Sequence, residues 1–113
     1  MKLLIVDDSP SMRSMIRSIV ALPGDAVTEC DDGAEVVASF RACAPDVVLM
    51  DLQMPRMNGI RATRALKDVY PDATVIIVSQ FNDPEFRDEA EAAGAKSYFT
   101  KDHLLELQHF IHH

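Results

Sequence analysis

Chemically versatile side chains stand directly after short apolar runs that lie far apart in this 113-residue sequence. They are Asp7 and Asp8 after residues 3–6, Asp51 after residues 47–50, Ser79 after residues 75–78, and Lys101 after residues 97–100. If the fold brings the three carboxylates together they repel, because two unit charges about 5 Å apart at an effective dielectric of about 20 cost about 3 kcal/mol. A divalent cation would hold such a cluster, and a few oxygen ligands suit Mg²⁺.

The same residues could handle a phosphoryl group. Lys101 would supply a fixed positive charge and Ser79 a hydroxyl donor, so that together with the metal they form a cradle for phosphoryl oxygens. Asp51 is the predicted nucleophile, and its product is an aspartyl phosphate. An ionised carboxylate needs no general base. A loop carbonyl, that of Gln53, is the predicted neutral ligand of the metal.

Each of these residues also has a simpler interpretation when it is taken alone. Asp8 or Ser9 can cap a helix. Asp51 can be an ordinary loop acid, Ser79 a turn hydroxyl and Lys101 a solvated charge. Their shared position, each at the end of an apolar run, favours a functional site over four unrelated roles.

Segments with apolar residues every three or four positions separate the apolar runs. The predicted strands are residues 3–6, 26–30, 47–50, 75–78 and 97–100. Short strands that alternate with helices predict a (βα)5 domain with a five-stranded parallel sheet. The second and fifth runs are more polar and belong at the edges, which fits the doubly wound, flavodoxin-like α/β order 2-1-3-4-5. In that order the acidic residues flank the switch point, where such sheets bind ligands.

The composition indicates one domain, residues 1–113, in which 48% apolar residues can build a core. Eleven basic and eighteen acidic side chains give a net charge of −7, which argues against direct binding to nucleic acid or to anionic membranes. Cys30 and Cys43 are predicted to be reduced thiols in or near the core. Because no apolar stretch is long enough to cross a membrane and no signal peptide is evident, the expected location is the cytoplasm.

The motifs around the candidate residues resemble the receiver domain of two-component response regulators along essentially the whole chain. Residues 4–9 resemble the first strand and acidic pair of that family, and residues 51–59 look like its phosphoacceptor strand and loop. Residues 78–79 are similar to its hydroxyl position, and residues 98–101 resemble the end that carries the lysine. The resemblance implies a phosphorelay protein that holds Mg²⁺ and forms an aspartyl phosphate.

Carried over residue by residue, the resemblance also implies the metal ligands. Asp51 would accept a phosphoryl group from the histidine of a sensor kinase. Asp8 and Asp51 would bind Mg²⁺ directly, and Gln53 would bind it through the backbone carbonyl. Asp7 would help mainly through water.

The resemblance further implies a switch. Ser79 would hydrogen-bond the phosphoryl group and Lys101 would pair with it. The added charge of about −1.5 to −2 draws the hydroxyl of Ser79 toward it. The space that is vacated would admit the ring of Tyr98, which changes the surface of the last strand and its flanking helices. Gln80 stands where the family usually has a small residue, which bears on the lifetime of the phosphoryl group.

A receiver of this kind is a regulatory domain rather than an enzyme, and assists only its own phosphorylation and dephosphorylation. It would control an output domain or a partner. Residues 79–84 and the pair Lys101-Asp102 look more like receivers that precede a helix-turn-helix DNA-binding domain, so transcription regulation is expected. A homodimer formed on phosphorylation stays open.

Two other functions are weighed against this one. A haloacid-dehalogenase-like phosphatase also uses an aspartate nucleophile after a strand, but its D-x-D pattern needs an acid where this chain has Gln53. A flavodoxin-like cofactor carrier must cradle a phosphate in its first loop, and Asp7 and Asp8 would repel that phosphate without a metal.

Overall fold

The computed structural model describes all 113 residues as one parallel sheet with helices on both faces. The strand order β2-β1-β3-β4-β5 confirms the predicted flavodoxin-like topology. The strands are β1 (Lys2–Val6), β2 (Ala26–Cys30), β3 (Val47–Met50), β4 (Val75–Ser79) and β5 (Ser97–Thr100). The helices are α1 (Pro10–Val20), α2 (Val36–Cys43), α3 (Gly59–Val69), α4 (Pro84–Ala92) and α5 (Leu104–His112), with a short 3₁₀ helix at Gly33–Glu35.

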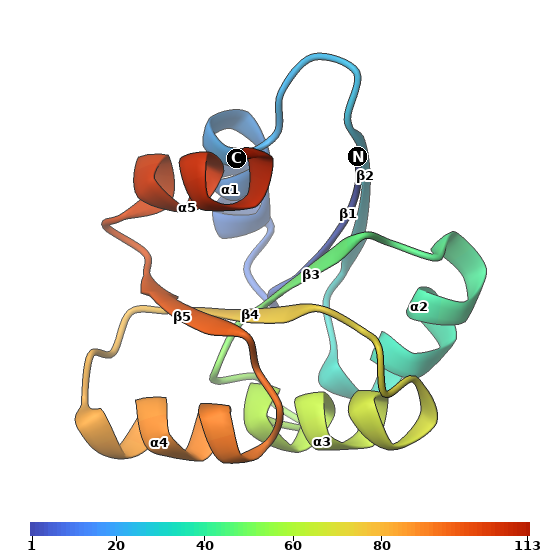
Figure 1. Cartoon of the computed structure of the whole chain (residues 1–113), viewed down its shortest axis with the longest axis vertical. Helices are drawn as coiled ribbons and strands as arrows, with labels where there is room; N and C mark the ends of the chain where they lie inside the picture. Colours follow the sequence, from blue (N-terminus) through green and yellow to red (C-terminus); the bar gives the residue numbers. More distant parts are fainter.

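The helices form two layers, with α1 and α5 on one face of the sheet and α2, α3 and α4 on the other (Figure 1). Successive residues of a strand point to opposite faces. Leu4 therefore packs in the core under α2, α3 and α4, whereas Leu3 and Ile5 pack in the core under α1 and α5. All four residues of β3 are buried, as expected for a strand with helices on both sides.

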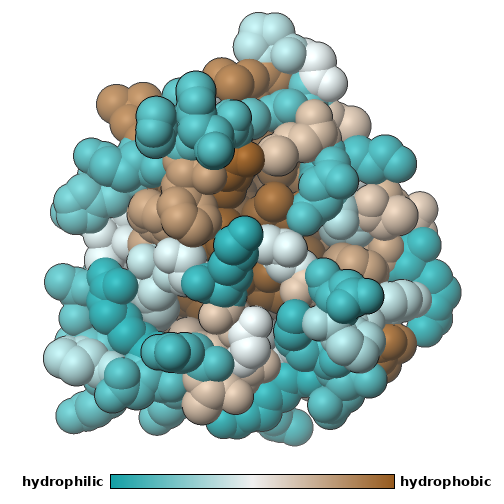
Figure 2. Space-filling model, in the orientation of Figure 1, coloured by the Kyte–Doolittle hydropathy of each residue, from teal (hydrophilic) through white to brown (hydrophobic).

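The edge positions of β2 and β5 follow from their polarity. Most residues of β2 are at least partly exposed, and only Cys30 at its end is buried. Figure 2 shows hydrophobic residues gathered near the centre of one face of the molecule, where the sheet lies in Figure 1, with hydrophilic residues around them.

Cys30 and Cys43 are free thiols, one buried and one half-buried, as predicted.

Local signals fix where the helices begin. The side chain of Ser9 accepts a hydrogen bond from the backbone N–H of Met12 at 3.3 Å, and Pro10 occupies the first turn of α1. Asn58 caps α3 in the same way, by accepting from the N–H of Arg61 at 2.9 Å. No helix is long and apolar enough to cross a bilayer.

One bound differs from the predicted strands. Ser79 is the last residue of β4 rather than the first residue after it. The final helix begins at Leu104, because residues 101 and 102 form a turn after β5.

Candidate functional site

The carboxyl ends of β1 and β3 bring the acidic residues together. Val6 and Met50 are paired in the parallel register, so the residues that follow them are neighbours. The backbone N–H of Asp51 donates to the carbonyl of Val6 at 2.8 Å and fixes this juxtaposition. Asp7, Asp8 and Asp51 each place one carboxylate oxygen within 4.8 Å of the others. The predicted meeting of the three acids is present.

Asp7 and Asp8 are adjacent in the sequence but differ in exposure. Asp7 is 1% exposed, and its Oδ1 accepts from the N–H of Ser9 at 2.9 Å. Asp8 is exposed at the mouth of the site. The guanidinium of Arg13 donates to the carbonyl of Asp7 at 2.7 Å and steadies the backbone at this point. The two acids therefore offer one inner and one outer carboxylate to a shared ligand.

Lys101 reaches the cluster from the end of β5. Its Nζ lies 3.0 Å from Oδ2 of Asp7 and 3.1 Å from Oδ1 of Asp51. The Oδ2 of Asp7 is nevertheless a buried oxygen without a well-directed hydrogen bond. One amine thus contacts two carboxylates in a cluster of three, and the site keeps excess negative charge.

The charges in the site shift one another's titration. The pKa of Asp51 is raised to about 6, because burial and, to a lesser extent, the charge of Asp7 raise it by more than Lys101 lowers it. Burial of the Lys101 amine lowers its pKa, but the Asp51 and Asp7 carboxylates outweigh that effect and leave the pKa raised. The lysine therefore stays charged at neutral pH, whereas ionised Asp51 is held in an unfavourable field.

The donor set fits Mg²⁺. Hard carboxylate oxygens in small number, with open space for waters, are what this ion prefers. Asp8, Asp51 and Gln53 line the same open recess, together with Asp7. The Oδ2 of Asp7, which is buried and has no well-directed hydrogen bond, is a further oxygen in this set.

The loop between β3 and α3 depends on a close backbone approach. The N–H of Gly59 donates to the carbonyl of Leu52 at 2.7 Å. A Cβ atom built on Gly59 would lie 2.0 Å from the carbonyl oxygen of Asp51, so only glycine fits. This contact sets the position of the nucleophile candidate and of the loop that carries Gln53.

Ser79 ends β4, and the two residues that follow it line the recess that contains the acidic cluster. It is fully buried, and its Oγ accepts from the N–H of Phe81 at 3.0 Å. The backbone N–H of Lys101 donates to the carbonyl of Ser79 at 2.8 Å, so the two residues are neighbours across β4 and β5. Phe81 lines the recess beside Gln80. The residue pattern did not predict a role for Phe81, although its position two residues after the Ser79 hydroxyl could have indicated one.

Tyr98 is already inside the fold. Only 9% of Tyr98 is exposed, and its hydroxyl donates to the carbonyl of Phe81 at 2.7 Å. The ring belongs to the core under α2, α3 and α4. The ring therefore occupies the inner position that the expected switch gives it, and its movement on phosphorylation stays a prediction.

A family model described as response regulator receiver domain matches residues 3–111. The chain belongs to the response regulator receiver family. It is 36% identical over 110 residues to the chemotaxis protein CheY of Bacillus subtilis, covering 93% of this chain and 92% of that protein. It is 34% identical to the uncharacterized transcriptional regulatory protein YxjL of the same organism, covering 93% of this chain but only 49% of that relative.

Solved structures agree with the receiver assignment. A LuxR-family two-component response regulator from Aurantimonas superposes with a TM-score of 0.90 at 35% identity, over 98% of this receiver and 81% of that chain. The response regulator domain of CheB from Thermotoga maritima gives a TM-score of 0.89 at 30% identity, over 99% and 93%. The chain is therefore a CheY-like receiver domain of two-component signalling, and neither the phosphatase nor the flavodoxin-like alternative finds support.

Proposed function

We propose that this receiver accepts a phosphoryl group on Asp51 from the histidine of a sensor kinase. The observation that carries the proposal is the set of three carboxylates within 4.8 Å, faced by the Lys101 amine at 3.0 and 3.1 Å. In the transfer, a carboxylate oxygen of Asp51 forms a bond to phosphorus while the bond from phosphorus to the donor nitrogen breaks. The electron pair of that bond leaves with the histidine.

The metal ligands proposed are Asp8 and Asp51 directly, the Gln53 carbonyl, and Asp7 mainly through water. The exposure of Asp8 and the contact between Asp7 and Lys101 support this division. Bound Mg²⁺ neutralises charge on the phosphoryl oxygens. The protein's own residues keep the nucleophile in place, since Gly59 and Val6 fix the backbone of Asp51.

Ser79 and Lys101 are the proposed contacts of the phosphoryl oxygens. Ser79 would exchange its hydrogen bond from Phe81 for one to the phosphoryl group, and Tyr98 would respond through its bond to the same loop residue. These two hydrogen bonds through Phe81 support the proposal that a change at the site reaches the surface of β5. Beyond assisting its own phosphorylation and dephosphorylation, the domain would have no enzymatic activity.

We take residues 1–113 as one receiver domain that acts in the cytoplasm and controls an output domain or partner. Relatives named as transcriptional regulatory proteins, of which this chain spans about half the length, support a C-terminal DNA-binding output. The net charge of −7 disfavours direct nucleic acid or membrane contact by the receiver itself. A homodimer formed on phosphorylation fits the same scheme.

The test is phosphorylation by acetyl phosphate with Mg²⁺, followed by intact mass measurement. One acid-stable, base-labile phosphoryl adduct is expected on the wild-type chain and none on Asp51→Asn. Asp72→Asn, an exposed acid in the turn before β4, is the matched control and should keep the adduct. An adduct that survives in Asp51→Asn would refute the assignment, and sustained turnover of small phosphate esters would refute the non-enzymatic role.

A further inference from the structure

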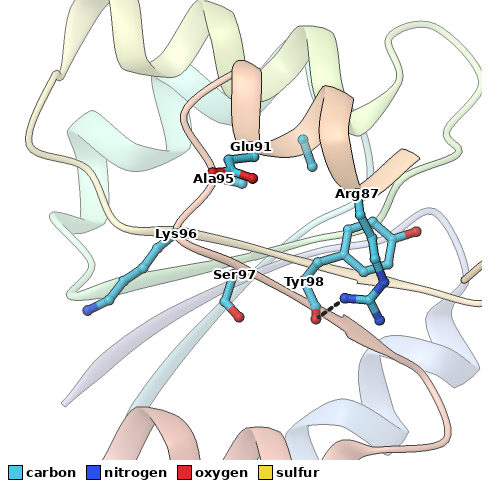
Figure 3. A pocket seen from close by; sticks show the side chains of 7 residues that line it. Arg87, Glu91, Ala95, Lys96, Ser97 and Tyr98 are labelled. Carbon is cyan, nitrogen blue, oxygen red and sulfur yellow. Dashed lines mark hydrogen bonds between the residues drawn. The ribbon is translucent and has the colours of Figure 1, made fainter. Parts of the chain in front are cut away.

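Arg87 extends from α4 across the ring of Tyr98 on β5 (Figure 3). Its guanidinium carbon lies 4.6 Å from the ring centroid, within the range of a cation–π interaction. Its Nη1 also donates to the backbone carbonyl of Tyr98 at 3.3 Å, the dashed line in Figure 3. One side chain thus contacts both the ring and the backbone of the residue proposed to respond to phosphorylation.

A second acceptor fixes the plane of the guanidinium. Nε and Nη2 of Arg87 donate to the same Oδ1 of Asn82, at 2.9 and 2.7 Å. Asn82 belongs to the loop between β4 and α4, so Arg87 joins this loop, its own helix and β5. Such a fork requires arginine, because a lysine ammonium cannot supply three donors in one plane.

The contacts of Tyr98 continue to the candidate site. Its hydroxyl donates to the carbonyl of Phe81, and the N–H of Phe81 donates to Oγ of Ser79. The connected groups run from Arg87 on the surface to the buried hydroxyl of Ser79 at the end of β4. Every link is a hydrogen bond or a ring contact between named atoms.

We infer that Arg87 is a positioning residue that holds Tyr98 in its buried position, which is the position that the proposed switch gives this ring when Ser79 binds a phosphoryl group. The link to the phosphoryl group rests on the proposed function, but the effect on Tyr98 does not. A solvent-exposed cation over an aromatic ring shifts an equilibrium by about two- to fivefold. Coupling is reciprocal, so loss of Arg87 weakens phosphoryl binding by a similar factor.

The first experiment measures the solvent accessibility and mobility of the Tyr98 ring in metal-free protein. The chain has two tyrosines and no tryptophan, so Tyr70→Phe leaves Tyr98 as the only strong fluorophore. In this background Arg87→Met should raise acrylamide quenching of Tyr98 and broaden the signal of a fluorotyrosine label. Arg87→Lys keeps a charge near the ring, so its quenching and line width should lie between those of the wild type and those of Arg87→Met. Arg64→Met, an exposed arginine on α3, should change nothing.

The second experiment measures binding of beryllofluoride, a phosphoryl analogue, in the presence of Mg²⁺. Arg87→Met should weaken this affinity about two- to fivefold and leave the affinity for Mg²⁺ alone unchanged. Unchanged Tyr98 signals in Arg87→Met, or an equal change in Arg64→Met, would overturn the inference. A changed Tyr98 signal with unchanged beryllofluoride affinity would overturn the coupling to Ser79. Wild-type protein that does not bind beryllofluoride would instead refute the proposed function, and the metal-free measurement would still decide the role of Arg87.

Discussion

At the scale of single residues, the site is defined by one amine against two buried carboxylates. Lys101 lies within 3.1 Å of both Asp7 and Asp51. Because a cation at that distance competes with a metal for the same carboxylates, Lys101→Ala should bind Mg²⁺ more tightly, by up to about tenfold. Titration calorimetry measures this.

The same variant should still lose the response to phosphorylation, since the amine no longer pairs with the phosphoryl group. Lys96→Ala, an exposed lysine just before β5, removes the same charge far from the site and should change neither property. Weaker Mg²⁺ binding in Lys101→Ala, or a partner affinity that still responds fully to phosphorylation, would contradict the role assigned to this lysine.

Asp51 makes metal-free protein less stable at neutral pH. Its pKa in the folded chain is about 6, above its ordinary 3.8. The folded state therefore disfavours the ionised form, and the cost is fully present above pH 6 and disappears below about pH 4. Asp51→Asn removes it and should raise the free energy of unfolding at pH 7 in EDTA by about 1–3 kcal/mol.

Urea unfolding at pH 7 and pH 4 tests this sign. The advantage of Asp51→Asn should shrink at pH 4, where the wild-type carboxyl is protonated in the folded state and partly protonated in the unfolded state. Added Mg²⁺ should stabilise the wild-type chain and reduce the difference at pH 7. A variant that is less stable than wild type in EDTA at pH 7 would show that the carboxylate is not held in an unfavourable field.

At the scale of elements, the joint between β3 and α3 decides where the nucleophile candidate sits. Gly59→Ala would place a methyl group 2.0 Å from the carbonyl oxygen of Asp51, so the strand end or the helix start must move. We expect a loss of about 1–3 kcal/mol in unfolding free energy and weaker Mg²⁺ binding.

Gly24→Ala is the matched control in the turn before β2. Gly24 has φ +94° and open space around it, so alanine there costs about 1 kcal/mol of backbone strain and should leave Mg²⁺ affinity unchanged. If both variants lose stability and only Gly59→Ala loses metal affinity, the close approach positions the site. Equal Mg²⁺ affinities in the two variants would show that it does not.

At the scale of the whole molecule, Asp25 connects the C-terminal helix α5 to the turn before β2 and to the N-terminus. Its carboxylate accepts from the N–H of Leu22 at 2.8 Å and lies 2.7 Å from Nε2 of His112 on α5. The hydrogen bond from Leu22 is the main reason that the pKa of Asp25 is lowered. The amino group of Met1, 2.9 Å from Oδ1, lowers it further, and His112 adds a smaller effect. A lowered pKa means that the folded state favours the ionised carboxylate.

Asp25→Asn should therefore destabilise the protein by about 1–2 kcal/mol at pH 7. This contribution is present above the ordinary pKa of an aspartate and is lost as the pH falls below about 4, so the difference from wild type should narrow in acid. Hydrogen exchange should be faster in α5 than in α3. Faster exchange spread evenly over all helices would mean that Asp25 does not act on α5 in particular.

The sequence by itself determined the topology and the meeting of the acids. Strands covered on both faces must be apolar along their length, as residues 47–50 are, and polar edge strands leave only the outer places. Parallel strands end at one rim, so residues such as Asp7 and Asp51 meet there whatever their separation in the chain. These inferences depend on periodicity and connectivity, which are local properties.

Only the tertiary structure decided which of the residues at that edge of the sheet are buried and which contacts each of them makes. Asp7 is buried and Asp8 exposed because the chain turns between them into α1, and no composition signal distinguishes two adjacent aspartates. Tyr98 is inside because α4 supplies Arg87 above its ring and the loop before α4 supplies an acceptor for its hydroxyl. Such contacts depend on distances of a few ångströms between separate elements, and packing sets those distances while the pattern of residue types does not.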